Sequence, residues 1–240
     1  MSVPKGWMTR TLGSLGLIQG GGTPSRNEPS YFGGSIPWVT PTDLSPKGRV
    51  ASLGNVAEAI SDAGLRASSA KMLERGSVLF SSRASIGKIA VSDRPCATNQ
   101  GFINITPIAD VADAWFVAYL LAWQTPELVR LAGKTTFLEI PKGKFKDFET
   151  QLPGVLEQRR IASCIRDCME RVDEIQALRE AARKQQVHLS AAVIESVLHP
   201  SLATDAGWAN LPVNDIIVES RNGRSISQDV EVGQTDSCLR

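Results

Sequence analysis

The sequence has few of the features that would assign a protein to a class at once. Its four cysteines, Cys96, Cys164, Cys168 and Cys238, are too scattered for the disulfide framework of a small secreted domain. Cys164 and Cys168 would share a helical face, but without further Cys or His nearby they make a poor zinc site, so we expect no metal. No apolar run approaches the length of about eighteen residues that a membrane span needs, and segment 1–10 lacks a signal-peptide core, so we expect a cytoplasmic protein.

An excess of one charge is also lacking. The 26 Lys and Arg residues nearly balance the 25 Asp and Glu residues and leave a formal charge of +1. This balance gives the whole chain no attraction for nucleic acid, so any DNA contact must come from local clusters. The sequence has no G-x-G-x-x-G loop, Walker lysine, H-E-x-x-H or Asn-Pro-Pro-aromatic motif, so we expect catalytic chemistry to lie in partners.

The first part of the sequence is a segment of about 150 residues in which glycines and prolines separate short runs typical of β-strands. These runs are rich in β-branched and aromatic residues and end in turn residues. Strands are predicted at 36–44, 77–81, 86–91 and 101–105. The strand at 36–44 is broken by prolines, so it should be an edge strand or be followed by a turn. Ser61 or Asp62 is a possible cap of a helix.

Two further helices are predicted in the same segment. The first begins at Asp110 or Asp113 and carries an aromatic face that we expect in the core, and the second begins at Thr125-Pro126. We therefore predict an α+β fold in which a mixed α/β domain with a β-sheet core spans residues 1–152.

The most regular pattern follows at residues 153–200, where apolar residues recur at steps of three, four or seven. From Leu156 to Leu198 such a helix would be roughly 60 Å long at about 1.5 Å per residue. A stripe this narrow is typical of a coiled coil, so a helix that only oligomerises is one interpretation. The predicted helix interface, the apolar stripe, consists of Ile161, Ile165, Cys168, Val172, Ile175, Ala182, Leu189 and Val193.

Beyond His199-Pro200 the sequence resembles its own beginning. Gly207-Trp208 repeats Gly6-Trp7, and 222–225 takes the place of the glycine-rich segment 20–25. We expect residues 201–240 to be the truncated start of a second unit of the same kind as residues 1–152, too short to fold alone.

Several loops carry candidate contacts with phosphates or bases. The triple glycine at 20–22 could cradle a phosphate, although an ordinary turn explains it better. Arg83 lies between hydroxyl residues on a strand connector, which suits a phosphate or a guanine edge, but a solvated hairpin tip is an equal alternative. Residues 134–146 hold four lysines and form the strongest local basic patch, or else a solvated face.

Five motifs in order resemble the specificity (S) subunit of type I DNA restriction–modification systems. They are 21–25 (GGTPS), 36–44 (IPWVTPTDL), 81–87 (SSRASIG), 99–102 (NQGF) and 152–162 (LPGVLEQRRIA). The resemblance implies two target-recognition domains, each followed by a long helix, with the helices antiparallel as a ruler between two half-sites of a gapped DNA sequence. It also implies a non-catalytic subunit that recruits two methyltransferase (M) subunits using S-adenosylmethionine, and restriction (R) subunits using ATP and Mg.

The sequence departs from that pattern, because most of the second domain and the second helix are missing. We therefore predict a half-size S subunit with no cofactor of its own that homodimerises through the long helix. An inactive truncated subunit, a non-DNA coiled-coil scaffold and an enzyme remain as alternatives. The enzyme would be a nuclease with scattered carboxylates, or a serine acyl-transfer protein using the S-x-x-K spacing of Ser85 and Lys88.

The predicted DNA contacts divide by residue chemistry. Arginine pairs with guanine, and Asn or Gln with adenine, so Arg26, Arg83, Asn99 and Gln100 are the candidates for base readout. Lysines suit phosphates. The remaining predicted contacts are Thr23, Ser25, Ser82, Ser85, Lys88, Lys134, Thr135, Thr136, Lys142, Lys144 and Lys146.

Overall fold

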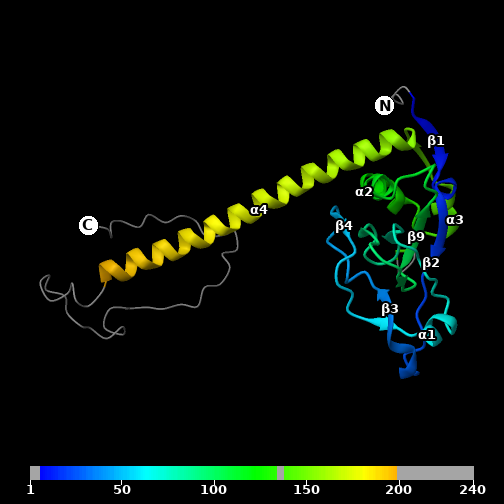
Figure 1. Ribbon diagram of the computed structural model, residues 1–240, viewed down its shortest axis with the longest axis horizontal. Coiled ribbons are helices and arrows are strands. Elements are labelled where there is room, and N and C mark those ends of the chain that lie inside the picture. The colour runs from blue at the N-terminus through cyan, green and yellow to red at the C-terminus, as the bar shows by residue number, and fades with distance from the viewer. Residues whose placement is uncertain (1–5, 134–137, 199–240) are drawn as a thin grey trace, which may run out of the picture. The chain divides into compact units, whose positions relative to one another are not determined.

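The computed structural model describes residues 6–133 and 138–198 (Figure 1). The chain divides into two units, Met1–Glu174 and Ile175–Arg240, and every strand within the described residues belongs to the first. The predicted unit at 201–240, and Lys134, Thr135 and Thr136, lie outside the described residues. No described helix combines the length and the apolar character needed to cross a lipid bilayer.

A five-stranded sheet forms the centre of the first unit. Its strand order is β2 (Gly16–Gly20), β9 (Phe102–Pro107), β6 (Val78–Ser81), β7 (Ile89–Val91) and β4 (Val50–Ser52). The pairs are antiparallel except β4 with β7, which is parallel. Strands β6 and β7 consist only of buried residues, which explains their continuous apolar sequence.

Helix α2 (Ala114–Arg130) packs on β4, β6 and β7 and supplies one side of the main core. The Asp113 carboxylate caps it by accepting a hydrogen bond from the Phe116 N–H at 3.0 Å, as one of the two predicted caps requires. Phe116 and Leu120 are buried, but Trp123 is 72 % exposed, so the predicted aromatic core face is wrong at that residue. Trp123 follows Leu120 on the same helix face, but there it lines an open groove with Trp7 and Tyr119 and is not covered by the core.

The predicted separate helix at Thr125-Pro126 is also wrong, because Pro126 lies inside the single helix α2. Proline removes one helical hydrogen bond. Leu121 and Leu128, on either side of Pro126, are both buried in the same core, so packing keeps the helix continuous.

A smaller three-stranded sheet has the order β5 (Ala59–Ile60), β3 (Phe32–Val39) and β8 (Ala97–Thr98). It packs Trp38 and Ile60 in a core of its own beside α1 (Asp62–Arg66), whose N-cap is the predicted Ser61. Strand β3 is the central strand, so its proline marks no edge. The alternative that we gave, a turn after the strand, is confirmed by the bond from Asp43 N–H to the Thr40 carbonyl.

The last sheet joins the two ends of the globular part. Strand β1 (Met8–Thr11) pairs antiparallel with β10 (Glu149–Leu152). The 3-10 turn η1 (Leu12–Ser14) follows β1 and packs on α3 (Lys142–Asp147), while the other 3-10 turn, η2 (Pro29–Tyr31), precedes β3. This pairing fixes the point from which the chain continues beyond β10.

One continuous helix, α4 (Val155–Leu198), follows β10 with 44 residues, about 66 Å at about 1.5 Å per residue (Figure 1). The predicted α+β fold with a sheet core and a long C-terminal helix is thus confirmed. The first unit runs to Glu174 and so includes the start of α4, whereas the boundary predicted from sequence lies at residue 152.

Candidate nucleic-acid interface

Backbone hydrogen bonds bring together loops that lie far apart in the sequence. Gly22 N–H donates to the Thr98 carbonyl at 2.9 Å, and Asn99 N–H to the Val39 carbonyl at 3.0 Å. Ser82 N–H donates to the Gly101 carbonyl at 2.8 Å. We call the joined segments the loop cluster, defined as residues 21–28, 40–44, 82–88, 99–101 and 138–140. All four candidates for base readout lie in it: Arg26, Arg83, Asn99 and Gln100.

The triple glycine is neither a phosphate cradle nor an ordinary turn. Gly20 ends β2, and a Cβ on Gly21 would collide with the Asn99 carbonyl, while one on Gly22 would collide with Ala70 N. The Gly22 N–H is already bonded, so it is not free for an anion. These glycines are needed because two backbones pass close on either side of them.

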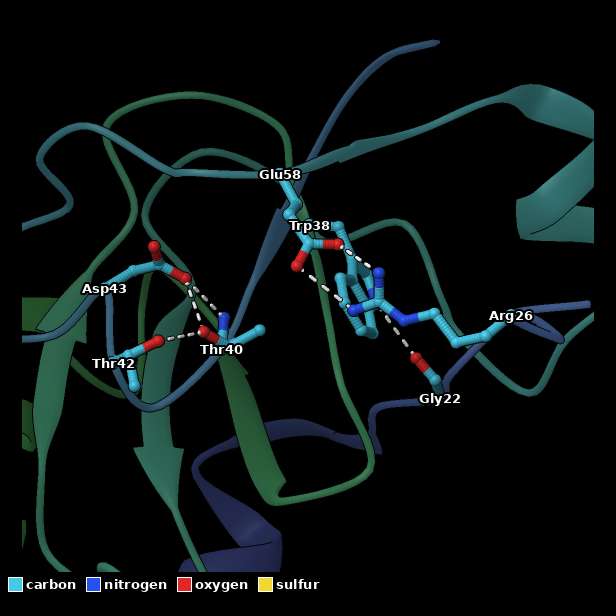
Figure 2. A network of polar contacts seen from close by, with 7 residues as sticks. All are labelled: Gly22, Arg26, Trp38, Thr40, Thr42, Asp43 and Glu58. Atoms are coloured by element: carbon cyan, nitrogen blue, oxygen red, sulfur yellow. Dashed lines mark hydrogen bonds and ion pairs between the residues drawn. The ribbon is translucent and has the colours of Figure 1, made fainter. Parts of the chain in front are cut away.

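Arg26 is held on two sides (Figure 2). Its guanidinium forms an ion pair with Glu58 at 2.7 Å and lies over the rings of Phe32 and Trp38, at 4.5 and 5.3 Å from the centroids. Trp38 is fixed in turn, because its indole N–H donates to the Gly22 carbonyl at 2.9 Å. The hydrogen bond with Glu58 raises the pKa of Arg26. The Arg26 side chain remains 57 % exposed, so a fixed cation faces solvent.

The neighbouring turn is rigid for a separate reason. Asp43 accepts hydrogen bonds from the Thr40 N–H at 2.7 Å and the Thr40 hydroxyl at 2.8 Å (Figure 2), and its other oxygen accepts from Ala57 N–H at 3.1 Å. Lys88 Nζ donates to the Pro41 carbonyl at 2.7 Å. Lys88 therefore braces this turn, and the geometry gives no support to a catalytic pairing with Ser85.

Besides Lys88, three predicted contacts lie on the connector between β6 and β7. Arg83 is half-buried and pairs with Glu139 at 3.7 Å. Ser82 is 2 % exposed and its hydroxyl donates to the Gly101 carbonyl, so it shapes the loop and does not reach the surface. Ser85 is half-buried and its carbonyl accepts from the Ser81 hydroxyl.

Amide and hydroxyl side chains occupy the adjoining loops. The Asn99 Oδ1 accepts from Gly101 N–H at 2.9 Å, which shapes the turn and leaves the Asn99 Nδ2 as a donor. Gln100 is exposed and its Oε1 accepts from the Thr23 hydroxyl. Thr23 and Ser25 are both exposed.

Three of the predicted lysines lie on one short helix. Lys142, Lys144 and Lys146 are exposed on α3, while Phe145 between them is buried and packs on Phe80 with 5.4 Å between ring centroids. A buried aromatic anchor therefore holds three cations at the surface. Ile140 N–H donates to the Ser82 carbonyl at 2.9 Å, which ties the start of this segment to the loop cluster.

The apolar stripe divides into two parts. Ile161 and Ile165 are partly buried against the first unit, and the other six members are exposed. The sequence prediction missed three exposed apolar residues in the C-terminal half of α4, which also holds Leu189 and Val193. They are Leu178, Val187 and Ile194. Ile165 also lines a groove of about 680 Å³ whose other walls include Trp7, Trp123 and Tyr119.

Sequence reasoning missed two polar residues that organise these surfaces. Glu58 lies 32 residues from Arg26, and Gln158 is a fully buried side chain at the start of α4. Glu58 belongs to no local pattern, whereas Gln158 lies in the motif 152–162, which we quoted for the resemblance without assigning the glutamine a role. Within residues 6–133 and 138–198, no group of three or more His, Cys, Asp or Glu side chains is placed to hold a metal ion.

Polar loops joined by backbone hydrogen bonds and a lysine-bearing helix beside them are features of a recognition module, and here a long helix with exposed apolar residues follows them. Residues 4–188 match the family described as "Type I restriction modification DNA specificity domain", and the chain belongs to this family. This agrees with the resemblance of the five sequence motifs.

Two curated relatives carry the same kind of name. The chain is 33% identical over 165 residues to the "Type I restriction enzyme MjaIX specificity subunit" of Methanocaldococcus jannaschii, covering 68% of this chain and 38% of the relative. It is 28% identical over 163 residues to the "Type I restriction enzyme EcoR124I/EcoR124II specificity subunit" of Escherichia coli, covering 65% and 39%. The matched region thus spans about two fifths of these relatives.

Solved structures share the fold. A chain from a study of "complex assembly and conformational transition of the type I R-M system" aligns with a TM-score of 0.65 at 22% identity, over 81% of this chain and 46% of the other. The HsdS subunit of Thermoanaerobacter tengcongensis aligns with a TM-score of 0.55 at 23% identity, over 72% and 40%.

Proposed function

We propose that this protein is a non-catalytic specificity subunit that reads one half of a gapped, bipartite DNA site. The observation that carries the proposal is the loop cluster, in which candidate base-reading side chains lie on loops tied together by backbone hydrogen bonds. Membership of the specificity-domain family supports recognition of DNA sequence. Reading bases needs donors and acceptors held in a fixed register against the major groove, and rigid loops supply that.

Base readout is assigned to Arg26, Arg83, Asn99 and Gln100. Arg26 is pre-positioned, because aromatic rings and a carboxylate restrict its rotamers before DNA arrives, so less side-chain entropy is lost on binding. The pair with Glu58 is exposed and contributes little energy, so guanine can compete for the guanidinium donors. Asn99 retains its amide donor for an adenine edge.

The lysines of α3 are assigned to phosphates. They are exposed, adjacent to the loop cluster through Ile140, and flexible, which suits contacts that position the protein without reading sequence. Four other predicted contacts would lie between the base-reading residues and the phosphate-binding lysines. They are Thr23, Ser25, Ser85 and Lys88.

A second copy of the chain would complete the bipartite reader. The exposed apolar residues of α4 favour association, and the groove beside Ile165 adds apolar surface at the other end of the stripe. Two copies joined by an isologous contact give two recognition domains and two helices, so the half-sites would be identical in sequence.

Chemistry is assigned to partners. Methyltransferase (M) subunits would bind S-adenosylmethionine, and restriction (R) subunits would bind ATP and Mg. This chain would recognise the DNA sequence. The test is a gel shift of the chain with M against a randomised duplex pool, followed by sequencing of the bound fraction. A bipartite motif with identical halves is the expected result, whereas binding without any enriched motif would refute sequence readout.

Sedimentation tests the dimer separately. Leu189→Asp places a charge on the apolar stripe and is expected to give a monomer at concentrations where the unchanged chain is dimeric. Ala181→Asp adds the same charge at an exposed position off the stripe and is expected to leave the dimer intact. An unchanged chain that stays monomeric both alone and with M would rule out homodimerisation.

A further inference from the structure

The joint between the globular part and α4 is short. Only Pro153 and Gly154 separate the last residue of β10 from the first residue of α4. Gly154 is exposed, and a Cβ added there would meet no atom within 4 Å. The Gly154 carbonyl accepts the first helical hydrogen bond of α4, from the Gln158 N–H at 3.0 Å, and this bond belongs to the helix itself. Contacts made by side chains of α4 must therefore set the direction in which the helix leaves the domain.

One side chain makes most of the polar contacts at this joint. Gln158, on the first turn of α4, has 0% exposure. Its Nε2 donates to the Val111 carbonyl at 3.1 Å and to the Pro153 carbonyl at 2.9 Å, while its Oε1 accepts from the Asp113 N–H at 3.0 Å. Both amide hydrogens and the carbonyl oxygen are therefore used, and all three partners are backbone groups.

These three bonds connect two helices. Asp113 is the N-cap of α2, whose apolar face forms the sheet core, so Gln158 attaches the start of α4 to the start of α2. The neighbouring contacts are less restrictive. Arg159 donates to the Ala109 carbonyl from an exposed position at 3.3 Å, and Ala162 packs in the core without directional bonds.

Two more contacts join α4 to the globular part further along the helix, a cation–π contact and an ion pair, and both are exposed. Arg166 lies over the Trp115 ring at 5.3 Å, and Asp173 pairs with Arg49 at 2.6 Å. Exposed pairs re-form easily in other geometries and contribute little. A buried carboxamide bonded to three backbone groups has one satisfied geometry, because any rotation of the helix would leave buried donors and acceptors without partners.

We infer that Gln158 is a positioning residue that fixes the direction of α4 relative to the recognition domain and thereby sets the spacer length between the two half-sites. This inference rests on the proposed function, in which α4 joins two half-site readers. A helix about 66 Å long acts as a lever, so a small change of angle at its start displaces the other reader by a large distance. A wrong spacer would then have to be corrected by deforming the DNA.

The experiment compares the unchanged chain, Gln158→Met and Gln176→Met, each bound with M to duplexes that share both half-sites and differ only in spacer length. Methionine has nearly the shape of glutamine but lacks its hydrogen bonds, and Gln176 is an exposed position on the same helix. The unchanged chain and Gln176→Met are expected to prefer one spacer by about tenfold over its neighbours, from the cost of deforming DNA. Gln158→Met is expected to reduce that preference to less than about threefold, with base-pair preferences inside each half-site unchanged.

A merely structural role for Gln158 would lower affinity for every spacer by the same factor, and that result overturns the inference. If the unchanged chain binds no bipartite site, the proposed function fails, and the spacing role falls with it. If the unchanged chain prefers one spacer and Gln158→Met keeps the same preference, only the inference fails.

A measurement without DNA covers the case in which the variant binds too weakly. Spin labels at Cys164 and at Arg75→Cys, both exposed positions of the first unit outside the apolar stripe, are introduced after Cys168→Ala and Cys238→Ser. Cys96 is buried and escapes labelling. One narrow distance in the unchanged background and a broad distribution with Gln158→Met support the inference, while equal distributions contradict it.

Discussion

Joint replacement of Lys142, Lys144 and Lys146 by glutamine tests the proposed division between phosphate contacts and base contacts. All three lysines are exposed on α3, and none of their side chains supports the core, which here depends on Phe145. The free energy of unfolding should therefore change by no more than about 0.5 kcal/mol per substitution. Any loss of DNA affinity can then be assigned to the missing charges.

The magnitude follows from counterion release. If each lysine neutralises one phosphate, three lost contacts at about 0.9 each make the slope of log K against log salt shallower by about 2.7. Raising salt from about 50 to about 200 mM should then weaken the unchanged protein about 40-fold more than the variant. The ratio of affinities for the target and for a scrambled duplex should stay the same, because phosphates carry no sequence information.

Fluorescence anisotropy titrations of the chain with M, on target and scrambled duplexes at four or more salt concentrations, measure both quantities. The matched control replaces Lys71, Arg75 and Lys184 by glutamine, which removes the same charge at exposed positions outside α3 and the loop cluster. An unchanged salt slope in the α3 variant would refute the phosphate assignment. A selective loss of target affinity would move these lysines to base readout.

Gly21→Ala is expected to lower the free energy of unfolding, measured in urea, by roughly 1–3 kcal/mol through overpacking. The control Gly143→Ala places its new Cβ in open space and should raise the free energy of unfolding by up to about 1 kcal/mol. Equal effects of the two substitutions would contradict the close-packing argument. Asp113→Ala removes the cap of α2 and should cost about 1 kcal/mol in the same assay, while Asp113→Asn should keep most of the stability. Burial raises the pKa of Cys96 from 9.0 to about 11, so the unfolded chain loses this proton first and stability should fall as the pH rises from 9 to 11. Iodoacetamide should label the exposed Cys164 well before Cys96, and equal labelling rates in the folded protein would show that Cys96 is accessible.

Local patterns were enough to predict the elements whose stability is local. Segments 77–81 and 86–91 predicted strands because β-branched residues are bounded by turn residues, and β6 and β7 lie there. Asp113 and Ser61 cap helices as predicted, because a capping side chain bonds within its own turn. The long helix followed from an apolar period sustained for about nine turns, from Ile161 to Val193.

Elements that depend on distant neighbours were not predictable in this way. The sequence around Pro126 predicts a break, but burial of Leu121 and Leu128 in one core keeps α2 continuous. The triple glycine suggests a turn or an anion loop, and only the folded chain shows that residues 98–99 and 69–70 pass against it. The apolar stripe predicts an interface but cannot show that its first members already contact the domain.

The sequence by itself determined the α+β class, the family and the long helix, since each depends on the order and period of nearby residues. Tertiary structure decided which side chains work together. It placed Glu58 against Arg26, turned Lys88 to the Pro41 carbonyl, buried Ser82, and joined Gln158 to the backbone of residues 111–113. Such pairings join residues that are tens of positions apart, so they exist only once the backbone has closed and hydrogen bonding has selected one partner for each buried group.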